Sequence, residues 1–270
     1  MIGERDTLRF APGVALEGDR LSDVVRGTSW PLNASGAFVL ARATQPIGET
    51  VHAFARAYSL APDEARDDVL QFVWSLNRLA LVNVESDGSR ARRLRDWAKL
   101  AARLAPAGAL PAILTRRRAL DTRSVPRAVA TCLAATSARC VFVAAVALAL
   151  TAQVVAVGAA GLAAWLALGI ATGTGLGLHE AGHAALLRGV PSALVTCGRR
   201  TSVLHAALGP TRRSLVALGG PLGVSALGFG IVAAGWLAAV PVLVLAGCPL
   251  AAHALALTVA GGDGKVLCGL

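Results

Sequence analysis

Cysteine is scarce in this chain, and no two cysteines stand at metal-binding spacing. The 270 residues include five cysteines, at positions 132, 140, 197, 248 and 268, and none forms a C-x-x-C pair. This distribution excludes a zinc knuckle and argues against a disulfide framework. We therefore expect the cysteines to be small core residues in a reducing compartment.

The chain contains few lysines, and its N-terminal residues do not form an apolar segment. Lys99 and Lys265 are the two lysines, and arginine supplies the other cations of a chain with formal net charge +10. Abundant Arg, Ala and Gly suggest a bacterial genome of high GC content. The polar start, Met1 to Asp6, lacks the apolar core of a signal peptide, so we expect the N-terminal domain in the cytosol.

Negative charge is rare in one strongly basic segment, residues 85–127. Between Ser89 and Arg127 only Asp96 and Asp121 oppose eleven cations. A nucleic acid could bind such a cluster, but apolar sequence follows it directly. We therefore predict a basic amphipathic juxtamembrane linker bound to anionic lipid headgroups, and no nucleic-acid partner. A solvated charged linker helix is the alternative.

Residues 128–270 are apolar and contrast with the charged first half. The whole chain is 55% hydrophobic, with a mean hydropathy of +0.60. About 20 apolar residues cross a bilayer, and four such segments are predicted near Cys140–Val157, Leu162–Leu187, Leu215–Ala234 and Trp236–Val259. Arginines gather in the loop between the second and third segments, which the positive-inside rule places in the cytosol with both termini. We expect a multi-pass protein of the bacterial cytoplasmic membrane.

The second apolar segment contains an H-E-x-x-H motif, formed by His179, Glu180 and His183. Residues four apart share one face of a helix, so both histidines can present a ring nitrogen to one Zn²⁺. Glu180 is then a candidate general base. Because an ionisable residue inside a membrane is costly and is usually retained for function, a chance match is the weaker interpretation.

A catalytic zinc site usually has three protein ligands and a water, so the two histidines need a partner. The candidates are Asp263, His253 and His205, followed by Cys248 and Cys268. The Asp-Gly dipeptide at position 263 ends the fourth apolar segment, near the depth of the histidines. The same dipeptide commonly forms a turn at a helix end, so the residues alone leave the choice open.

Residues 140–270 resemble the site-2-protease-like (M50-type) intramembrane zinc metalloproteases. That family carries H-E-x-x-H on one transmembrane helix, a Gly-Pro element on the next and Asp-Gly on a third. The corresponding residues here, in the same order, are His179–His183, Gly219–Leu222 and Asp263-Gly264.

The resemblance implies a zinc metalloendopeptidase in which Asp263 is the third metal ligand. Glu180 would be catalytic, and Pro221 would lie in the substrate-binding region. Val224 stands where the family often has Asn, and the Asn- and Pro-rich lead-in to Asp-Gly is missing. These departures concern substrate positioning more than metal binding.

Residues 1–84 combine short strand-like patterns with helical ones. The predicted strands are Leu8–Leu16, Leu21–Val25 and Ser29–Leu32, broken at Pro12-Gly13, Gly18-Asp19 and Gly27. A helix is predicted to begin at Asn33, and two more span Ile47–Tyr58 and Pro62–Leu79. These patterns favour a small α+β domain.

Several residues of this domain follow the order found in one family: Gly27, Leu32–Ala37, Asp63–Ala65, Asp67–Val69, Phe72, Leu76 and Leu81-Val82. They resemble PqqD-like domains, the winged-helix RiPP recognition elements that hold a leader peptide as an added strand. The resemblance places substrate-binding residues on one strand and one helix: Ser29, Leu32, Arg66, Val69, Leu70 and Val73. An acidic or amphipathic leader would suit Arg66 and Arg78.

The two resemblances together imply a small winged-helix-like α+β domain followed by an all-α membrane domain of about four transmembrane helices. The chain would bind the leader of a ribosomally made, post-translationally modified peptide and cleave the precursor. Its partners would be that precursor, the bilayer, and biosynthetic or export proteins. One alternative is a regulatory intramembrane protease of a membrane-bound signalling protein. Another is a non-proteolytic peptide-binding partner of a modifying enzyme or exporter.

Overall fold

The computed structural model describes residues 2–86, 114–136, 159–197, 200–258 and 262–268. The chain divides into two compact units. Unit 1 contains Met1–Ala119 and Ala193–Ala206, and unit 2 contains Leu120–Ser192 and Ala207–Leu270. The first predicted membrane segment and residues 87–113 of the predicted basic linker lie outside the described residues.

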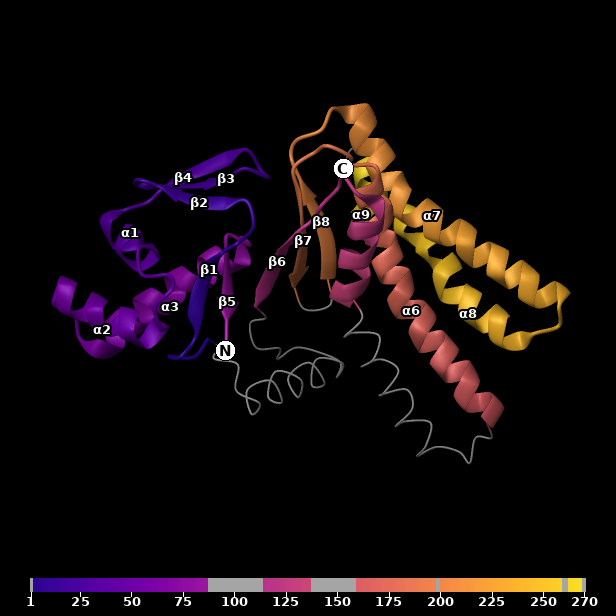
Figure 1. The fold of residues 1–270 in the computed structure, drawn as a ribbon, viewed down its shortest axis with the longest axis horizontal. Helices are drawn as coiled ribbons and strands as arrows, with labels where there is room; N and C mark the ends of the chain where they lie inside the picture. The colour runs from indigo at the N-terminus through magenta and orange to yellow at the C-terminus, as the bar shows by residue number, and fades with distance from the viewer. Residues whose placement is uncertain (1, 87–113, 137–158, 198–199, 259–261, 269–270) are drawn as a thin grey trace. The chain divides into compact units, whose positions relative to one another are not determined.

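Unit 1 opens with four short strands and three helices (Figure 1). These are β1 (Thr7–Phe10), β2 (Val14–Glu17), β3 (Arg20–Asp23), β4 (Thr28–Pro31), α1 (Ala34–Leu40), α2 (Ile47–Tyr58) and α3 (Pro62–Arg78). The three predicted helices are confirmed. The predicted strand Leu8–Leu16 is two strands, because the chain turns at Gly13, whose φ is +80°. Strands β2, β3 and β4 form an antiparallel sheet, while β1 pairs with β5 (Val82–Glu85).

The apolar stripe of α3 forms the core of unit 1. Ala65, Val69 and Val73 are at most 1% exposed and pack against α1, α2 and β1. Leu76 of the same helix packs into a second cluster under β2 and β3. The side chain of Asn33 caps α1 by accepting a hydrogen bond from Gly36 N at 2.8 Å. Capping therefore fixes the start of α1, and burial of its apolar stripe holds α3 in the core.

Strand β6 (Thr115–Ala119) also belongs to unit 1, and it pairs with β7 (Ser192–Cys197), which is followed by β8 (Arg200–His205). Side-chain amides attach β6 to α3 and β5. Asn77 Nδ2 donates to the Thr115 carbonyl and Thr115 N donates to Asn77 Oδ1, both at 2.8 Å. Asn83 pairs with the backbone of Arg117 in the same way. Each side-chain amide thus donates one hydrogen bond to β6 and accepts one from it, as the backbone of a neighbouring strand would.

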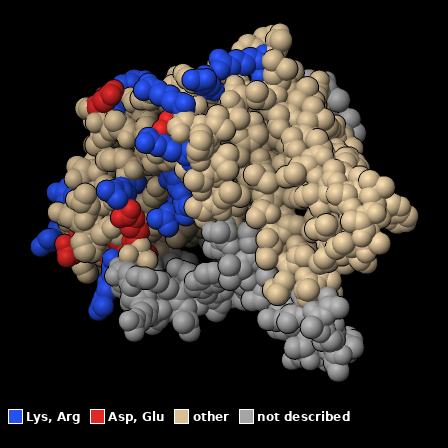
Figure 2. Space-filling view, turned by 45° about the vertical axis from the view of Figure 1, so that its right-hand side comes forward, with Lys and Arg blue, Asp and Glu red and all other residues tan. Residues whose placement is uncertain are grey.

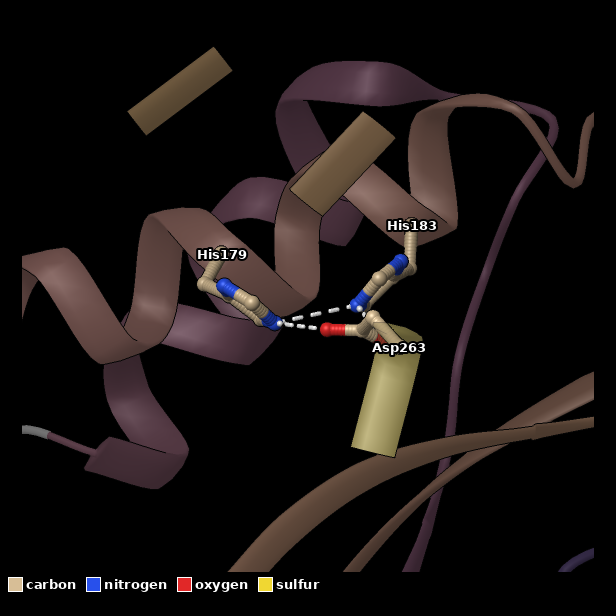
Figure 3. A group of neighbouring side chains, drawn as sticks. All are labelled: His179, His183 and Asp263. Carbon is tan, nitrogen blue, oxygen red and sulfur yellow. Dashed lines mark hydrogen bonds and ion pairs between the residues drawn. The ribbon is translucent and has the colours of Figure 1, made fainter. Parts of the chain in front are cut away.

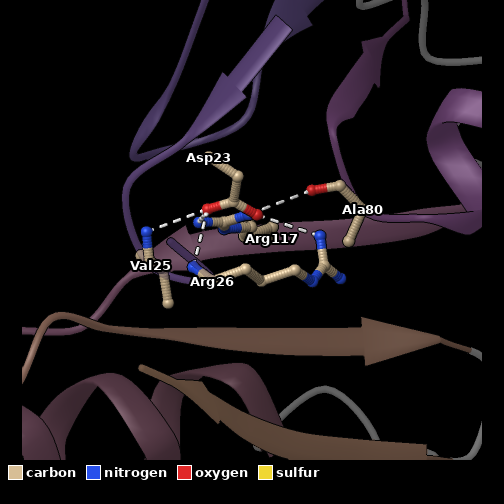
Figure 4. A network of polar contacts seen from close by, with 5 residues as sticks. All are labelled: Asp23, Val25, Arg26, Ala80 and Arg117. Atoms are coloured by element: carbon tan, nitrogen blue, oxygen red, sulfur yellow. Dashed lines mark hydrogen bonds and ion pairs between the residues drawn. The ribbon is translucent and has the colours of Figure 1, made fainter. Parts of the chain in front are cut away.

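A buried ion pair joins β3 to β6 (Figure 4). Arg117 Nη1 and Nη2 donate to the two carboxylate oxygens of Asp23 at 2.7 and 2.8 Å, and both side chains are 0% exposed. Burial alone would raise the pKa of Asp23, but the hydrogen bonds and charge of Arg117, together with Arg26, outweigh it and lower that pKa. The prediction of a lipid-facing linker is therefore wrong for Arg117.

Asp23→Asn should loosen β6, because Arg117 would keep a buried charge without its counter-ion. Breaking such a pair typically costs about 3–5 kcal/mol. Hydrogen exchange of the full chain should accelerate in β3 and β6. The control Arg9→Gln breaks an exposed pair with Glu85, and such pairs contribute about 0–1 kcal/mol. Unchanged exchange in β6 of Asp23→Asn would contradict this assignment.

The same pair predicts the sign of a pH dependence. Because the pKa of Asp23 is lowered in the folded chain, its stabilisation is complete above the unfolded carboxyl pKa of about 3.9. The stabilisation is lost as the pH falls through the lowered folded value. Protection of β6 amides should therefore be constant from neutral pH to about pH 4 and decline only below it.

Unit 2 is helical in the part of the chain that the structure describes (Figure 1). A helix over Val125–Thr136 is followed by α6 (Ala159–Ala185), α7 (Pro210–Leu237), α8 (Pro241–Ala251), the 3₁₀ helix η1 (Ala252–Leu257) and α9 (Gly262–Cys268). Helices α6, α7 and α8 pack on one another. Small residues permit the close approach of α6 and α7, since a Cβ on Gly182 would lie 2.5 Å from Gly219 O.

Among the described residues, one helix, α7, is long and apolar enough to cross a membrane. Val125–Thr136 and Pro241–Leu257 are shorter apolar helices. Four transmembrane helices are therefore not confirmed, and a single candidate is weak support for a membrane protein. The predicted fourth span is divided into α8 and η1, and Pro249 within α8 lacks the N–H that a regular α-helix uses.

Candidate functional site

The three predicted metal ligands come together in unit 2 (Figure 3). His179 Nε2 lies 3.1 Å from His183 Nε2 and 3.1 Å from Asp263 Oδ2. The distance from His183 Nε2 to Asp263 Oδ1 is 3.5 Å. Helix α6 supplies both histidines from one face, and α9 brings Asp263 to them from 84 residues further along the chain.

These separations fit a tetrahedral zinc ion. Nitrogen and oxygen ligands lie about 2.0–2.2 Å from zinc, so two of them in tetrahedral geometry are about 3.3 Å apart. The three observed distances lie on both sides of this value. Two imidazoles and one carboxylate are also a donor set that zinc enzymes use. The residues present therefore fit a zinc ion.

A backbone carbonyl fixes the ring of His183. Its Nδ1 lies 2.6 Å from the carbonyl oxygen of Val216 in α7. A carbonyl can only accept, so Nδ1 carries the proton and the Nε2 lone pair faces the cluster. The same interaction sets the orientation of the ring, and His183 is 8% exposed.

Gly220 in α7 leaves room for that ring, and its replacement is a sharp test of the site. A Cβ at Gly220 would lie 2.6 Å from His183 Nε2 and 2.7 Å from His179 O. Gly220→Ala should displace the His183 ring and weaken zinc binding roughly 10- to 100-fold, the range seen when ligand orientation is lost. Chelator competition on the full chain measures this. Gly223→Ala is the matched control, since nothing lies within 4 Å of its added Cβ. Equal affinities for the two variants would contradict the assignment.

The remaining residues that the sequence singled out near the metal cluster lie on α6 and α7. Glu180 is 9% exposed in α6, and Pro221 is buried in α7 directly after Gly220. Val224 packs with Ala171 and Leu250 in an apolar cluster. That cluster gives a physical reason for an apolar side chain where the metalloprotease family often has Asn, because an amide there would need buried partners.

Unit 1 contains an open groove of about 370 Å³ between α1 and α3. Its apolar lining consists of Val39, Phe54, Val69 and Phe72. Its polar lining consists of Asn33, Ser35, Asp68, Gln71 and Ser75. Asn33, the first of these lining residues in the chain, comes just after β4 and caps α1.

The outer side of β4 is open, since no described strand pairs with it. Leu32 N donates to Asp19 O at 2.7 Å. Bonded and non-bonded pairs alternate in an antiparallel ladder, so the backbone groups of Ser29 and Pro31 point outward. Ser29 offers both a donor and an acceptor, whereas Pro31 offers only its carbonyl.

The peptide-binding residues predicted from the sequence do not all meet in this groove. Val69 borders the groove but is only 1% exposed, Ser29 lies on β4, and Val73 is 0% exposed in the core. Leu32 is half-buried against the core cluster under β3. Arg66 and Leu70 line a separate pocket of about 170 Å³ beside α2.

Three groove residues were not among the predicted binding residues: Asp68, Phe72 and Ser75, which follow one another along α3 at helical spacing. They flank the buried stripe of α3 on one side, whereas Arg66 and Leu70 flank it on the other. The periodicity that identified the stripe could have shown both flanks. It carried no information on which flank lines the groove between α1 and α3.

Comparison with known families bears on unit 1. The family model of coenzyme PQQ synthesis protein D (PqqD) matches residues 16–82. These residues form a PqqD domain. The PqqD domain runs from β2 through α3 to the start of β5, so it contains both the groove and the open edge of β4. Neither a curated protein nor a solved structure matches the chain.

The match confirms the predicted resemblance for the N-terminal part of the chain. Strands β1 and β6 lie outside the matched residues, yet both pack on the PqqD domain. A fragment ending at residue 84 would leave Asp23, Asn77 and Asn83 without the backbone and guanidinium groups of β6. The full chain is therefore the appropriate material for binding experiments.

Proposed function

We propose that the chain is a zinc peptidase that binds the leader of a ribosomally made, modified peptide through its PqqD domain and cleaves that precursor. The observation that carries the peptidase assignment is the clustering of His179, His183 and Asp263 at zinc-ligand separations. The PqqD domain carries the leader assignment. A short peptide gene beside the gene for this chain would supply the substrate for testing both.

The chemistry assigned to the site is hydrolysis of a peptide bond. Bound zinc supplies Lewis-acid polarisation of the scissile carbonyl and lowers the pKa of a water molecule. Glu180 acts as general base, so its carboxylate accepts a proton from the attacking water. It then passes that proton to the leaving amine nitrogen as the C–N bond breaks. His179, His183 and Asp263 hold the metal and do not exchange protons with the substrate.

Leader binding is assigned to the groove and the outer edge of β4. An added strand would bond to the backbone of Ser29, and its alternate side chains would enter the groove beside α3. Asp68 is the charged residue that lines the groove, while Arg66 lies in the separate pocket. A leader with a basic residue close to an apolar anchor therefore suits the groove better than the acidic or amphipathic leader expected from Arg66 and Arg78.

Two neighbouring aspartates give a matched test of the leader site. Asp67 and Asp68 are both exposed on α3, but only Asp68 lines the groove. Asp68→Arg should weaken leader binding to the full chain at least about tenfold, since a hydrogen bond to a charged group contributes about 1.5–3 kcal/mol. Asp67→Arg should bind as wild type. Titration with leader and core peptides decides between them. Equal losses in both variants, or equal binding of leader and core, would move the regulatory-protease alternative ahead.

We place unit 2 in the bacterial cytoplasmic membrane as a multi-pass domain, with the PqqD domain in the cytosol. Residues 214–262 contain no charged side chain, and Figure 2 shows a broad surface without Lys, Arg, Asp or Glu over the helical part of unit 2. The arginines of α7, Arg212 and Arg213, lie at its N-terminal end. Large apolar side chains are exposed further along α7, among them Phe229 at 59%, Trp236 at 78% and Leu237 at 87%. Water disfavours an apolar surface of this kind, whereas lipid accommodates it.

A further inference from the structure

His253 is an ionisable side chain of unit 2 that the proposed mechanism does not use. It lies on η1, and its Nδ1 is 3.1 Å from Nδ1 of His179. The two rings are tilted by 38°, with their centroids 5.0 Å apart. His253 therefore meets the nitrogen of His179 that faces away from the metal cluster.

This geometry separates two roles for His253. A metal ligand would approach the Nε2 atoms of His179 and His183, which lie 3.1 Å apart and next to Asp263. His253 instead places its Nδ1 against the opposite side of the His179 ring. His253 is therefore positioned to orient the side chain of His179, and Asp263 is the third metal-binding residue beside His179 and His183.

We propose that His253 is a positioning residue that accepts a hydrogen bond from Nδ1 of His179 and so keeps the Nε2 lone pair of His179 directed at the metal. The inference rests on the proposed metal site. Metal-binding histidines almost always donate their second ring N–H to an acceptor, and His183 does so to the Val216 carbonyl. His253 supplies the equivalent acceptor for His179. Its own proton is then on Nε2, because a neutral imidazole has one donor and one acceptor nitrogen.

The packing around η1 supports this role. A Cβ on Gly175 of α6 would lie 3.0 Å from His253 Nε2 and 2.8 Å from Leu250 Cδ2. Glycine at this position therefore lets η1 approach α6 closely enough for the two imidazoles to meet. The buried side chain of Leu250, 5% exposed, fixes the end of α8 immediately before His253.

The test compares zinc affinity among four forms of the full chain in detergent, by competition with a chromogenic chelator. His253→Leu should bind zinc roughly 10- to 100-fold more weakly than wild type, as loss of an outer hydrogen-bond partner does. His253→Asn should recover most of the affinity, because its amide oxygen can take the place of Nδ1. His205→Leu removes a histidine of β8 in unit 1 and should bind as wild type.

Absorption of the cobalt-substituted chain gives a second readout. The d–d bands of His253→Leu should shift while those of His253→Asn stay close to wild type, because the bands report the geometry of the ligands themselves. Wild-type affinity in His253→Leu, or equal weakening in His253→Leu and His253→Asn, would overturn the positioning role and leave the metal site standing. A wild-type chain without zinc affinity would overturn the metal site and this inference together.

Discussion

Glu180→Gln is expected to abolish precursor cleavage and to leave zinc binding intact. The amide cannot accept the proton of the attacking water, and removal of a general base typically costs about 10²–10⁴-fold in rate. Zinc stays bound because Glu180 is assigned as the base and is not one of the three ligands. Mass spectrometry of a precursor incubated with the full chain measures the rate, and elemental analysis measures the metal.

Ser225→Ala is the control for this experiment. It also removes a buried polar group from unit 2, since Ser225 is 5% exposed in α7, but it has no part in the proposed chemistry. It should cleave at the wild-type rate. Cleavage by Glu180→Gln at a rate close to that of Ser225→Ala would remove Glu180 from the mechanism.

Asp263→Ala is expected to weaken zinc binding by more than the 10–100-fold that loss of an outer hydrogen-bond partner causes. The variant removes one of three protein ligands, which leaves two neutral imidazoles. Lys265→Ala is the matched control, since Lys265 lies exposed on the same short helix, α9. Full zinc in Asp263→Ala at limiting metal concentration would show that Asp263 is not a ligand.

Local signals explain why much of the PqqD domain could be predicted from the sequence. The breaks at Gly18 and Gly27 are turns with φ of +63° and +65°, and the cap residue Asn33 precedes α1. The boundaries of α2 were predicted correctly because Pro46 and Ser59 flank a regular apolar stripe. Each of these features depends on residues only a few positions apart.

Strand β6 could not be predicted, because its partners are distant in the sequence. Three consecutive arginines suggest a solvated or lipid-facing segment, yet Arg117 pairs with Asp23 across 94 positions. The amides of Asn77 and Asn83 that pair with β6 also gave no recognisable pattern. Long-range pairing of this kind overrides what the local composition indicates.

For the candidate metal site too, one part could be predicted from local sequence and another part depends on long-range packing. The spacing of His179 and His183 places them on one helix face, so their proximity follows from the sequence. The approach of Asp263 depends on how α9 packs on α7 and η1, and the residues alone left His253 as another candidate for the third ligand. The structure separates the two by the nitrogen of His179 that each one meets.

The zinc content of the purified full chain tests the central claim most directly. Elemental analysis should find about one zinc per chain in the wild type, as a catalytic site with three protein ligands binds. A double variant, His179→Asn with His183→Asn, should contain almost none. A wild-type chain with no more zinc than the double variant would contradict the account.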